Sequence, residues 1–276
     1  MTGCWLTPCD RYRFDAVRTL WPGTRPPLII AHRGASAACP ENTAAAFDAA
    51  MAAGCDGIEL DIQLSADGIP FVYHDRTLAR IGAGRRRASS LTMAELAAVD
   101  AGSWLHHRFH RERILSLSEL LERYARRTLL LIEMKVRTPA DPPDRRRQLA
   151  RAATELIRHH RLENRTALLC FDARTLASAR AALPRVRTVL NLHTRGRGRL
   201  PIRTRRMLGG LWALSLDIRS MTPEMAAAAR EAGRPLLTFT CNTERQVARA
   251  LECGADAVMS DSPAWLRGLL TQRPAR

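Results

Sequence analysis

Apolar residues gather in short β-like runs that alternate with alanine-rich, helix-favouring stretches from about residue 28 onward. The runs predict strands at residues 28–32, 57–64, 70–74, 128–135, 166–171, 187–192, 211–217, 235–241 and 256–260. Helices are expected at 44–53 and near 92–99, 116–126, 145–160, 173–182, 222–232 and 243–253. This alternation is typical of a parallel sheet covered by helices.

The pattern and the length of 276 residues favour an α/β fold of the TIM (β/α)₈ barrel type, which typically takes about 250 residues. There is one strand run too many for eight positions. The turn SADGI between 57–64 and 70–74 is too short for a crossover helix, so one of these two runs, or the last run, lies outside the regular alternation. We expect the barrel domain at 27–270, with an insertion at 76–115 over one mouth, an extension at 1–26 and a tail at 271–276.

Carboxylates interrupt two of the strand runs. In GIELDIQL, Glu59 and Asp61 project to one face of the strand, and LLLIEMK adds Glu133 and then Lys135, the chain's single lysine. Neighbouring buried carboxylates repel one another unless a cation compensates them. A solvated edge or a salt bridge is the alternative, but three hard oxygen donors favour a Mg²⁺ or Ca²⁺ site formed by Glu59, Asp61 and Glu133.

Two histidines, His32 and His74, follow apolar runs at strand ends, where active-site residues of such barrels gather. Two imidazoles can serve as acid and base on either side of a scissile P–O bond. Arg33 and Lys135 are suited to bind the phosphate oxygens. Arg33 would point away from His32 on an ideal strand, but Gly34 indicates that the strand has already ended.

The formal net charge of +16 predicts an attraction for anions such as phosphate esters. Nucleic acid is not an expected partner, because only 5% of the residues are aromatic and stacking platforms are scarce. Seven cysteines without a CxxC pair favour a reducing compartment. With no secretory h-region and no apolar run of 18 residues, we expect a cytoplasmic protein without stable membrane insertion.

Long motifs connect these residues to a known family. HRG, PENT, GCDGIELDIQLSADGIPFVYHD, LTMAELAAVDAG, IEMK, CFDARTL and TFTCNTERQVARALECGADAVMSDSP resemble the glycerophosphodiester phosphodiesterase family, whose barrel is of the phospholipase C-like type. The resemblance covers residues from about 28 to 266. It implies hydrolysis of small glycerophosphodiesters to glycerol 3-phosphate and an alcohol with a divalent cation.

The resemblance also implies roles for individual residues. The matching positions are, for the metal, Glu59, Asp61 and Glu133; for acid/base catalysis, His32 and His74; and for the phosphate, Arg33 and Lys135. Phe239 replaces the family's usual tryptophan and is expected in the substrate pocket, and Leu115-Ser116-Leu117 replaces Pro-Thr-Leu. The alcohol, the metal, the oligomeric state and the attacking group, water or a neighbouring glycerol hydroxyl, stay open at this stage.

Two other functions compete with this interpretation. One is a lysophospholipase D-like activity on a substrate that keeps an acyl chain, which predicts an apolar groove at the barrel mouth. The other is a non-catalytic barrel that binds anionic lipid or phosphate through the positively charged surface.

Overall fold

The computed structural model describes residues 20–21, 24, 27–137, 141–193 and 200–272. In these residues, strands form at every position that the sequence predicts. They are β1 (Leu28–His32), β2 (Gly57–Leu64), β3 (Pro70–Val72), β4 (Leu129–Met134), β5 (Thr166–Cys170), β6 (Arg187–Leu192), β7 (Ala213–Asp217), β8 (Leu236–Phe239) and β9 (Ala257–Ser260).

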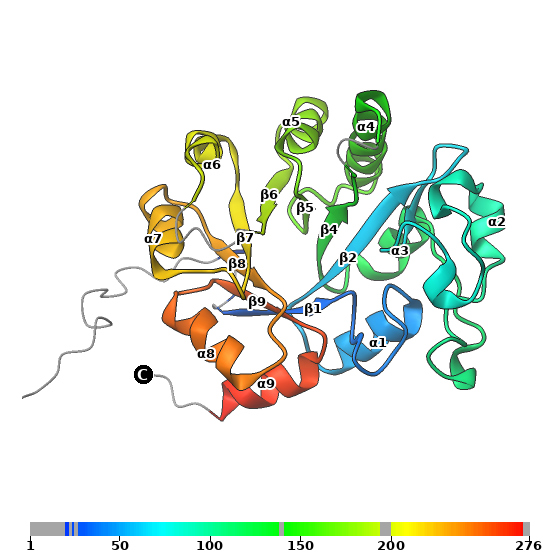
Figure 1. Cartoon of the computed structure of the whole chain (residues 1–276), viewed down its shortest axis with the longest axis horizontal. Coiled ribbons are helices and arrows are strands. Elements are labelled where there is room, and N and C mark those ends of the chain that lie inside the picture. Colours follow the sequence, from blue (N-terminus) through cyan, green and yellow to red (C-terminus); the bar gives the residue numbers. More distant parts are fainter. Residues whose placement is uncertain (1–19, 22–23, 25–26, 138–140, 194–199, 273–276) are drawn as a thin grey trace, which may run out of the picture.

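Eight of the strands form a closed parallel barrel, which confirms the predicted fold (Figure 1). The order is β1-β9-β8-β7-β6-β5-β4-β2, and the pairing of β1 with β2 closes the ring. β3 pairs with β2 in the antiparallel direction and is therefore the run outside the barrel. The hairpin forms because Gly68 adopts a φ of 84° and the hydroxyl of Ser65 accepts from the amide of Ile69 at 2.8 Å.

Helices surround the ring of strands in Figure 1. They are α1 (Ala44–Ala52), α2 (Met93–Ala97), α3 (Leu117–Tyr124), α4 (Pro143–His159), α5 (Ala173–Ala182), α6 (Ile202–Met207), α7 (Pro223–Glu231), α8 (Glu244–Glu252) and α9 (Pro263–Thr271). Both α6 and α9 were missed by the sequence analysis. Ser116, part of the departure from Pro-Thr-Leu, caps α3 in a capping box with Glu119, so this substitution keeps the helix start. None of the helices in the described ranges is long and apolar enough to cross a membrane.

Successive side chains along each strand point alternately outward and inward, and this alternation separates two apolar layers. Outward side chains such as Ile58, Leu60 and Ile132 pack against the helices in the main core. Inward side chains such as Leu28, Ile30 and Leu131 fill the barrel interior. Toward the carboxyl ends of the strands the same inward face becomes polar, which places a polar site where barrel enzymes carry their chemistry.

The amino end of the barrel is covered by two residues from the predicted extension. Leu20 and Trp21 are buried among the inward side chains, and the Trp21 ring lies 4.7 Å from that of Trp212. Trp21 Nε1 also donates to the carbonyl of Asn164 at 2.9 Å. The segment 1–26 therefore contributes to the core at these two positions, while residues 1–19 and, in the tail, 273–276 lie outside the described residues.

The predicted insertion, residues 76–115, follows β3 and packs on a small apolar cluster that joins Phe71 of β3 to Leu78, Leu91 and Leu96. It carries α2, at the right edge of Figure 1. Arg145 of α4 joins the insertion to the barrel, because its guanidinium donates to the carbonyls of Leu64 and Ser89 at 2.6 and 3.1 Å.

Candidate active site

Strand register brings the predicted site residues together. β2 lies between β1 and β4, with His32 paired with Glu59 on one side and Asp61 paired with Glu133 on the other. All four side chains point inward at the carboxyl ends of the strands. Residues about 100 positions apart in the chain thus become neighbours through the parallel pairing.

Glu59, Asp61 and Glu133 form an acidic triad. Each can offer a carboxylate oxygen within 4.8 Å of the others, and all three side chains are buried. Burial and the charge of Asp61 raise the pKa of Glu59 to about 8. A cluster of three buried carboxylates at this spacing matches the oxygen-donor set of a hard divalent cation.

Two basic side chains form ion pairs with carboxylates of the triad. Lys135 Nζ is 2.6 Å from Glu133 Oε1 and 2.9 Å from Asp61 Oδ1, and Arg33 Nε is 3.0 Å from Asp61 Oδ2. Burial alone would raise the pKa of Asp61, but the charges of Lys135 and Arg33 outweigh it and hold that pKa below its usual range. Asp61 is therefore the carboxylate of the triad that these cations keep ionised.

The turn after β1 explains how Arg33 reaches the site. β1 ends at His32, and Arg33 and Gly34 both take a positive φ, of 57° and 84°. The amide of Arg33 donates to the carbonyl of Glu59 at 2.9 Å, which anchors the turn. Gly34 is required there, because a Cβ would lie 2.6 Å from the carbonyl carbon of Ala46. The left-handed turn lets neighbouring His32 and Arg33 serve one site, as Gly34 indicated.

Each predicted catalytic histidine has an aspartate on one ring nitrogen. His32 Nδ1 lies 2.6 Å from Asp261 Oδ1, and His74 Nδ1 lies 2.7 Å from Asp75 Oδ1. Such carboxylates favour the tautomer with the proton on Nδ1 and leave Nε2 available. His32 Nε2 is 4.0 Å from Glu59 Oε2, so this nitrogen faces the triad.

The two imidazoles differ in their electrostatic surroundings. Burial would lower the pKa of His32, but the hydrogen bond with Asp261 and the charge of Glu59 outweigh it and raise the pKa. Burial lowers the pKa of His74, and Lys135 and Arg33 add to this effect against the opposing charge of Asp61. Opposite shifts of this kind suit a pair that divides acid and base roles.

The structure adds polar residues that the sequence analysis did not select. Asn42 Nδ2 donates to Asp61 Oδ2 at 2.8 Å, and Asn191 Nδ2 donates to Glu133 Oε2 at 3.1 Å. Asn191 Oδ1 is buried and accepts no hydrogen bond from the described residues. Asn42 lies in PENT and Asn191 at the carboxyl end of β6, so motif membership and strand-end position were the signals that could have found them.

A second network links the two histidine regions. Arg80 Nε donates to Asp75 Oδ2 and its terminal nitrogen donates to Glu41 Oε1, both at 2.6 Å. Glu41 Oε1 also accepts from Arg33 at 3.1 Å. Arg80 of the insertion thus connects the aspartate behind His74 to the arginine beside His32.

Phe239 lies at the carboxyl end of β8 in an aromatic group with Phe171 and His193. The His193 ring is 5.5 Å from Phe239 and stacks on Phe171 at 4.6 Å. His193 Nδ1 is also 2.9 Å from Asp217 Oδ2. Phe239 is therefore at the same end of the barrel as the triad, and its predicted substrate contact stays a prediction.

The seven residues predicted for metal, phosphate and acid/base roles all lie in this one region of the described structure. A closed parallel barrel with ionisable side chains gathered at the carboxyl ends of its strands defines an enzyme of the (β/α)₈-barrel class.

Comparison with known proteins identifies the family. The sequence model of the glycerophosphoryl diester phosphodiesterase family matches residues 32–265 of this chain. A glycerophosphodiester phosphodiesterase of Caldanaerobacter subterraneus is 30% identical over 253 residues, 88% of this chain and 97% of the relative. A Bacillus altitudinis enzyme of the same name is 28% identical over 236 residues, 85% of this chain and 94% of the relative. The chain belongs to the glycerophosphoryl diester phosphodiesterase family and is a phosphodiesterase of this class.

A solved structure supports the same placement. The Oleispira antarctica phosphodiesterase in complex with the product sn-glycerol 3-phosphate superposes with a TM-score of 0.78 and 28% identity. The match covers 89% of this chain and 97% of that one. The barrel and its connections are thus shared over nearly the full length of both proteins.

Proposed function

We propose that the protein hydrolyses glycerophosphodiesters to glycerol 3-phosphate and an alcohol, using a divalent cation bound by Glu59, Asp61 and Glu133. The main support for the proposal is the buried acidic triad, whose carboxylates form ion pairs with Arg33 and Lys135. The triad fits a hard cation because its donors are carboxylate oxygens and because Glu59 cannot ionise easily beside Asp61 without added positive charge. The donor set favours Mg²⁺ or Ca²⁺.

When bound, such a cation would polarise a phosphoryl oxygen and offset the triad's charge. The chain's own residues supply the rest of the proposed chemistry. Arg33 and Lys135 stabilise the negative charge that develops on the phosphoryl oxygens. The raised pKa values of both side chains, which burial alone would lower but the triad's carboxylates raise, keep them cationic.

His32 and His74 are the proposed acid/base pair. One imidazole accepts a proton through Nε2 from the attacking group, water or a neighbouring glycerol hydroxyl, and the other donates a proton to the oxygen of the leaving alcohol. If the glycerol hydroxyl attacks, water then opens the resulting cyclic phosphate to give glycerol 3-phosphate. Asp261 and Asp75 hold the rings and stabilise the imidazolium form of each histidine. They are positioning residues, since they act through the histidines.

Three substrates test this proposal: glycerophosphocholine, glycerophosphoethanolamine and glycerophosphoglycerol, each with Mg²⁺ or Ca²⁺. We expect release of glycerol 3-phosphate from at least one of them, and failure on all three would reject the proposal. A lysophospholipid added to the panel tests the lysophospholipase D-like alternative, which requires faster turnover of the acylated substrate. Anion binding without turnover of any substrate would support the non-catalytic alternative.

The cytoplasm is the compartment that we propose. Its support is the free state of the five cysteines in the described ranges, Cys39, Cys55, Cys170, Cys241 and Cys253. Burial raises the pKa of Cys170 to about 12, which keeps that thiol protonated and unreactive. Fractionation of the native cells, with an antibody against the protein, tests the assignment.

A further inference from the structure

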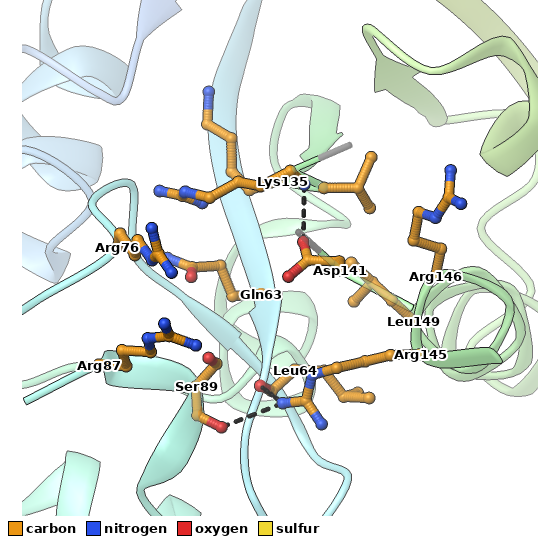
Figure 2. Close-up of a pocket in the computed structure, with 12 residues that line it drawn as sticks. Gln63, Leu64, Arg76, Arg87, Ser89, Lys135, Asp141, Arg145, Arg146 and Leu149 are labelled. Atoms are coloured by element: carbon orange, nitrogen blue, oxygen red, sulfur yellow. Dashed lines mark hydrogen bonds between the residues drawn. The ribbon is translucent and has the colours of Figure 1, made fainter. Parts of the chain in front are cut away.

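A pocket rich in arginine opens beside the candidate active site. Its floor is formed by Gln63 and Leu64 of β2, and Lys135 lies at its upper edge (Figure 2). In Figure 2 the labelled arginines of the insertion lie on one side and those of α4 on the other. These arginines are Arg76, Arg87, Arg145 and Arg146.

The pocket is continuous with the candidate active site. Gln63 follows Asp61 by two residues on β2 and therefore lies on the same face of the strand, about 7 Å further along. Its amide nitrogen donates to the carbonyls of Tyr73 and Asp75 at 2.8 Å, on either side of His74. Arg137, also in the lining, donates to the carbonyl of His74 at 3.3 Å. The pocket thus adjoins the site on its His74 and Lys135 side.

The charges in the pocket are strongly unbalanced. Its described lining contains five arginines and Lys135 against one acid, Asp141. Lys135 pairs with the triad and Arg146 with Asp172, whereas Arg145 donates to three backbone carbonyl groups. A concentration of positive charge at a concave surface attracts an anion.

Arg76 and Arg87 are the two arginines best placed to bind such an anion. Residues 77 and 87 form an antiparallel bridge, and the amide of Ala88 donates to the carbonyl of Arg76 at 3.0 Å. This pairing holds the exposed side chains of both arginines on adjacent segments that line the pocket. Within the described ranges, neither forms an ion pair with a carboxylate. A bound anion would accept hydrogen bonds from both guanidinium groups.

We propose that this arginine pocket binds a second phosphate, carried by the alcohol part of a glycerophosphodiester substrate. The inference rests on the proposed function. The cavity volume is about 40 Å³, which holds roughly three water-sized groups and so suits the oxygens of one phosphate. A short polyol between two phosphates would span from Lys135 to the floor at Gln63. The glycerol end would then lie toward His32, where a separate cavity is lined by Ser36, Glu41 and Asn242.

A matched pair of substrates tests the proposal. Glycerophosphoglycerol and bis(glycerophospho)glycerol, the deacylated form of cardiolipin, differ by one glycerophosphate unit. We expect kcat/KM for the larger diester to be about tenfold higher at low salt, which exceeds the twofold advantage of its two equivalent ends. Equal values, after this correction, would overturn the inference, while absence of turnover with both would instead refute the proposed function.

Variants locate the effect. In Arg76→Ala/Arg87→Ala, the ratio of the two kcat/KM values should fall to about two, and the ratio is independent of how much of the preparation is folded. Arg85→Ala is the control, because it removes one charge from the same exposed loop without lining the pocket, and it should keep the wild-type ratio. A loss in the control about half as large as in the double variant, in proportion to the charge removed, would show that the general surface potential, and not this pocket, selects the substrate.

The source of the phosphate is tested in the same assay. Inorganic phosphate that occupies the arginine pocket should lower the ratio in the wild type while leaving the ratio of the double variant unchanged. If millimolar phosphate lowers the ratio of the two kcat/KM values equally in the wild type and in the double variant, the result would contradict binding in this pocket.

Discussion

The most informative prediction concerns the proton on Glu59. In the metal-free protein, burial and the charge of Asp61 raise the pKa of this carboxyl to about 8 from an ordinary value of 4.5. Between these two pH values the folded protein holds a proton that the unfolded chain has released. Binding of a divalent cation to the triad must displace that proton, so cation binding and proton release are coupled.

The sign and size of the effect follow from this difference. Because the folded state binds more protons in the window, the free energy of unfolding of the metal-free protein falls as the pH rises from 4.5 to 8. This group alone contributes a slope of up to about 1.4 kcal/mol per pH unit. The affinity for the cation should rise by up to about tenfold per pH unit over the same window, because deprotonation is part of the binding reaction.

The assay combines denaturation and calorimetry. Chemical denaturation of the chelated protein from pH 5 to 8.5 gives the slope, and titration calorimetry in buffers of different ionisation enthalpy counts the protons released by Mg²⁺ or Ca²⁺. Glu59→Gln is the matched variant, since its neutral amide resembles the protonated carboxyl. It should bind the cation more weakly, flatten the slope and release no proton from this position. An unchanged slope in Glu59→Gln, or cation binding at pH 6.5 without proton release in the wild type, would show that Glu59 is already ionised in the folded, metal-free protein.

Three further predictions concern the residues around the triad. His32→Ala and His74→Ala should each lower kcat by about 10²–10⁴-fold with little change in thermal stability, and activity near wild type in either would remove that histidine from the acid/base pair. Asp261→Asn should lower kcat. Because this carboxylate raises the pKa of His32, the substitution should also move the limb of the pH–rate profile that reports His32 to lower pH. A fall in kcat with an unmoved profile would indicate a merely structural role. Gly34→Ala should lower the free energy of unfolding by about 1–3 kcal/mol in denaturant titrations. The reason is that φ is 84° at this position and the new Cβ would lie 2.6 Å from the Ala46 carbonyl carbon. An unchanged free energy of unfolding would contradict the tight turn.

The barrel strands could be predicted because buried parallel strands are continuous apolar runs with recognisable lengths. The sequence could not choose the run outside the ring, since that depends on whether 70–74 pairs back onto β2 or continues the barrel. The structure shows the former, through the hairpin at Gly68. α6 was missed because it spans only the six residues of IRTRRM, too few to show helical periodicity. α9 was missed although Pro263 begins it, and Gly268 weakens its helical pattern.

The candidate site was predictable where its members lie in local motifs. Glu59 and Asp61 share one strand face, and Lys135 follows Glu133 by two residues, so simple alternation groups each pair. The partners behind them were not predictable in this way. Asp261 lies 229 residues from His32 and reaches its ring only because β9 pairs with β1. Contacts that depend on closure of the ring carry no local periodicity, and therefore they required the structure.

The role of the cation can be tested by hydrolysis of glycerophosphoglycerol with protein from which divalent cations have been removed by a chelator. The acidic triad predicts that release of glycerol 3-phosphate stops, returns when Mg²⁺ or Ca²⁺ is added in excess of the chelator, and does not return in Asp61→Asn. Release of glycerol 3-phosphate at the original rate by the cation-free protein would show that hydrolysis does not need a cation held by Glu59, Asp61 and Glu133.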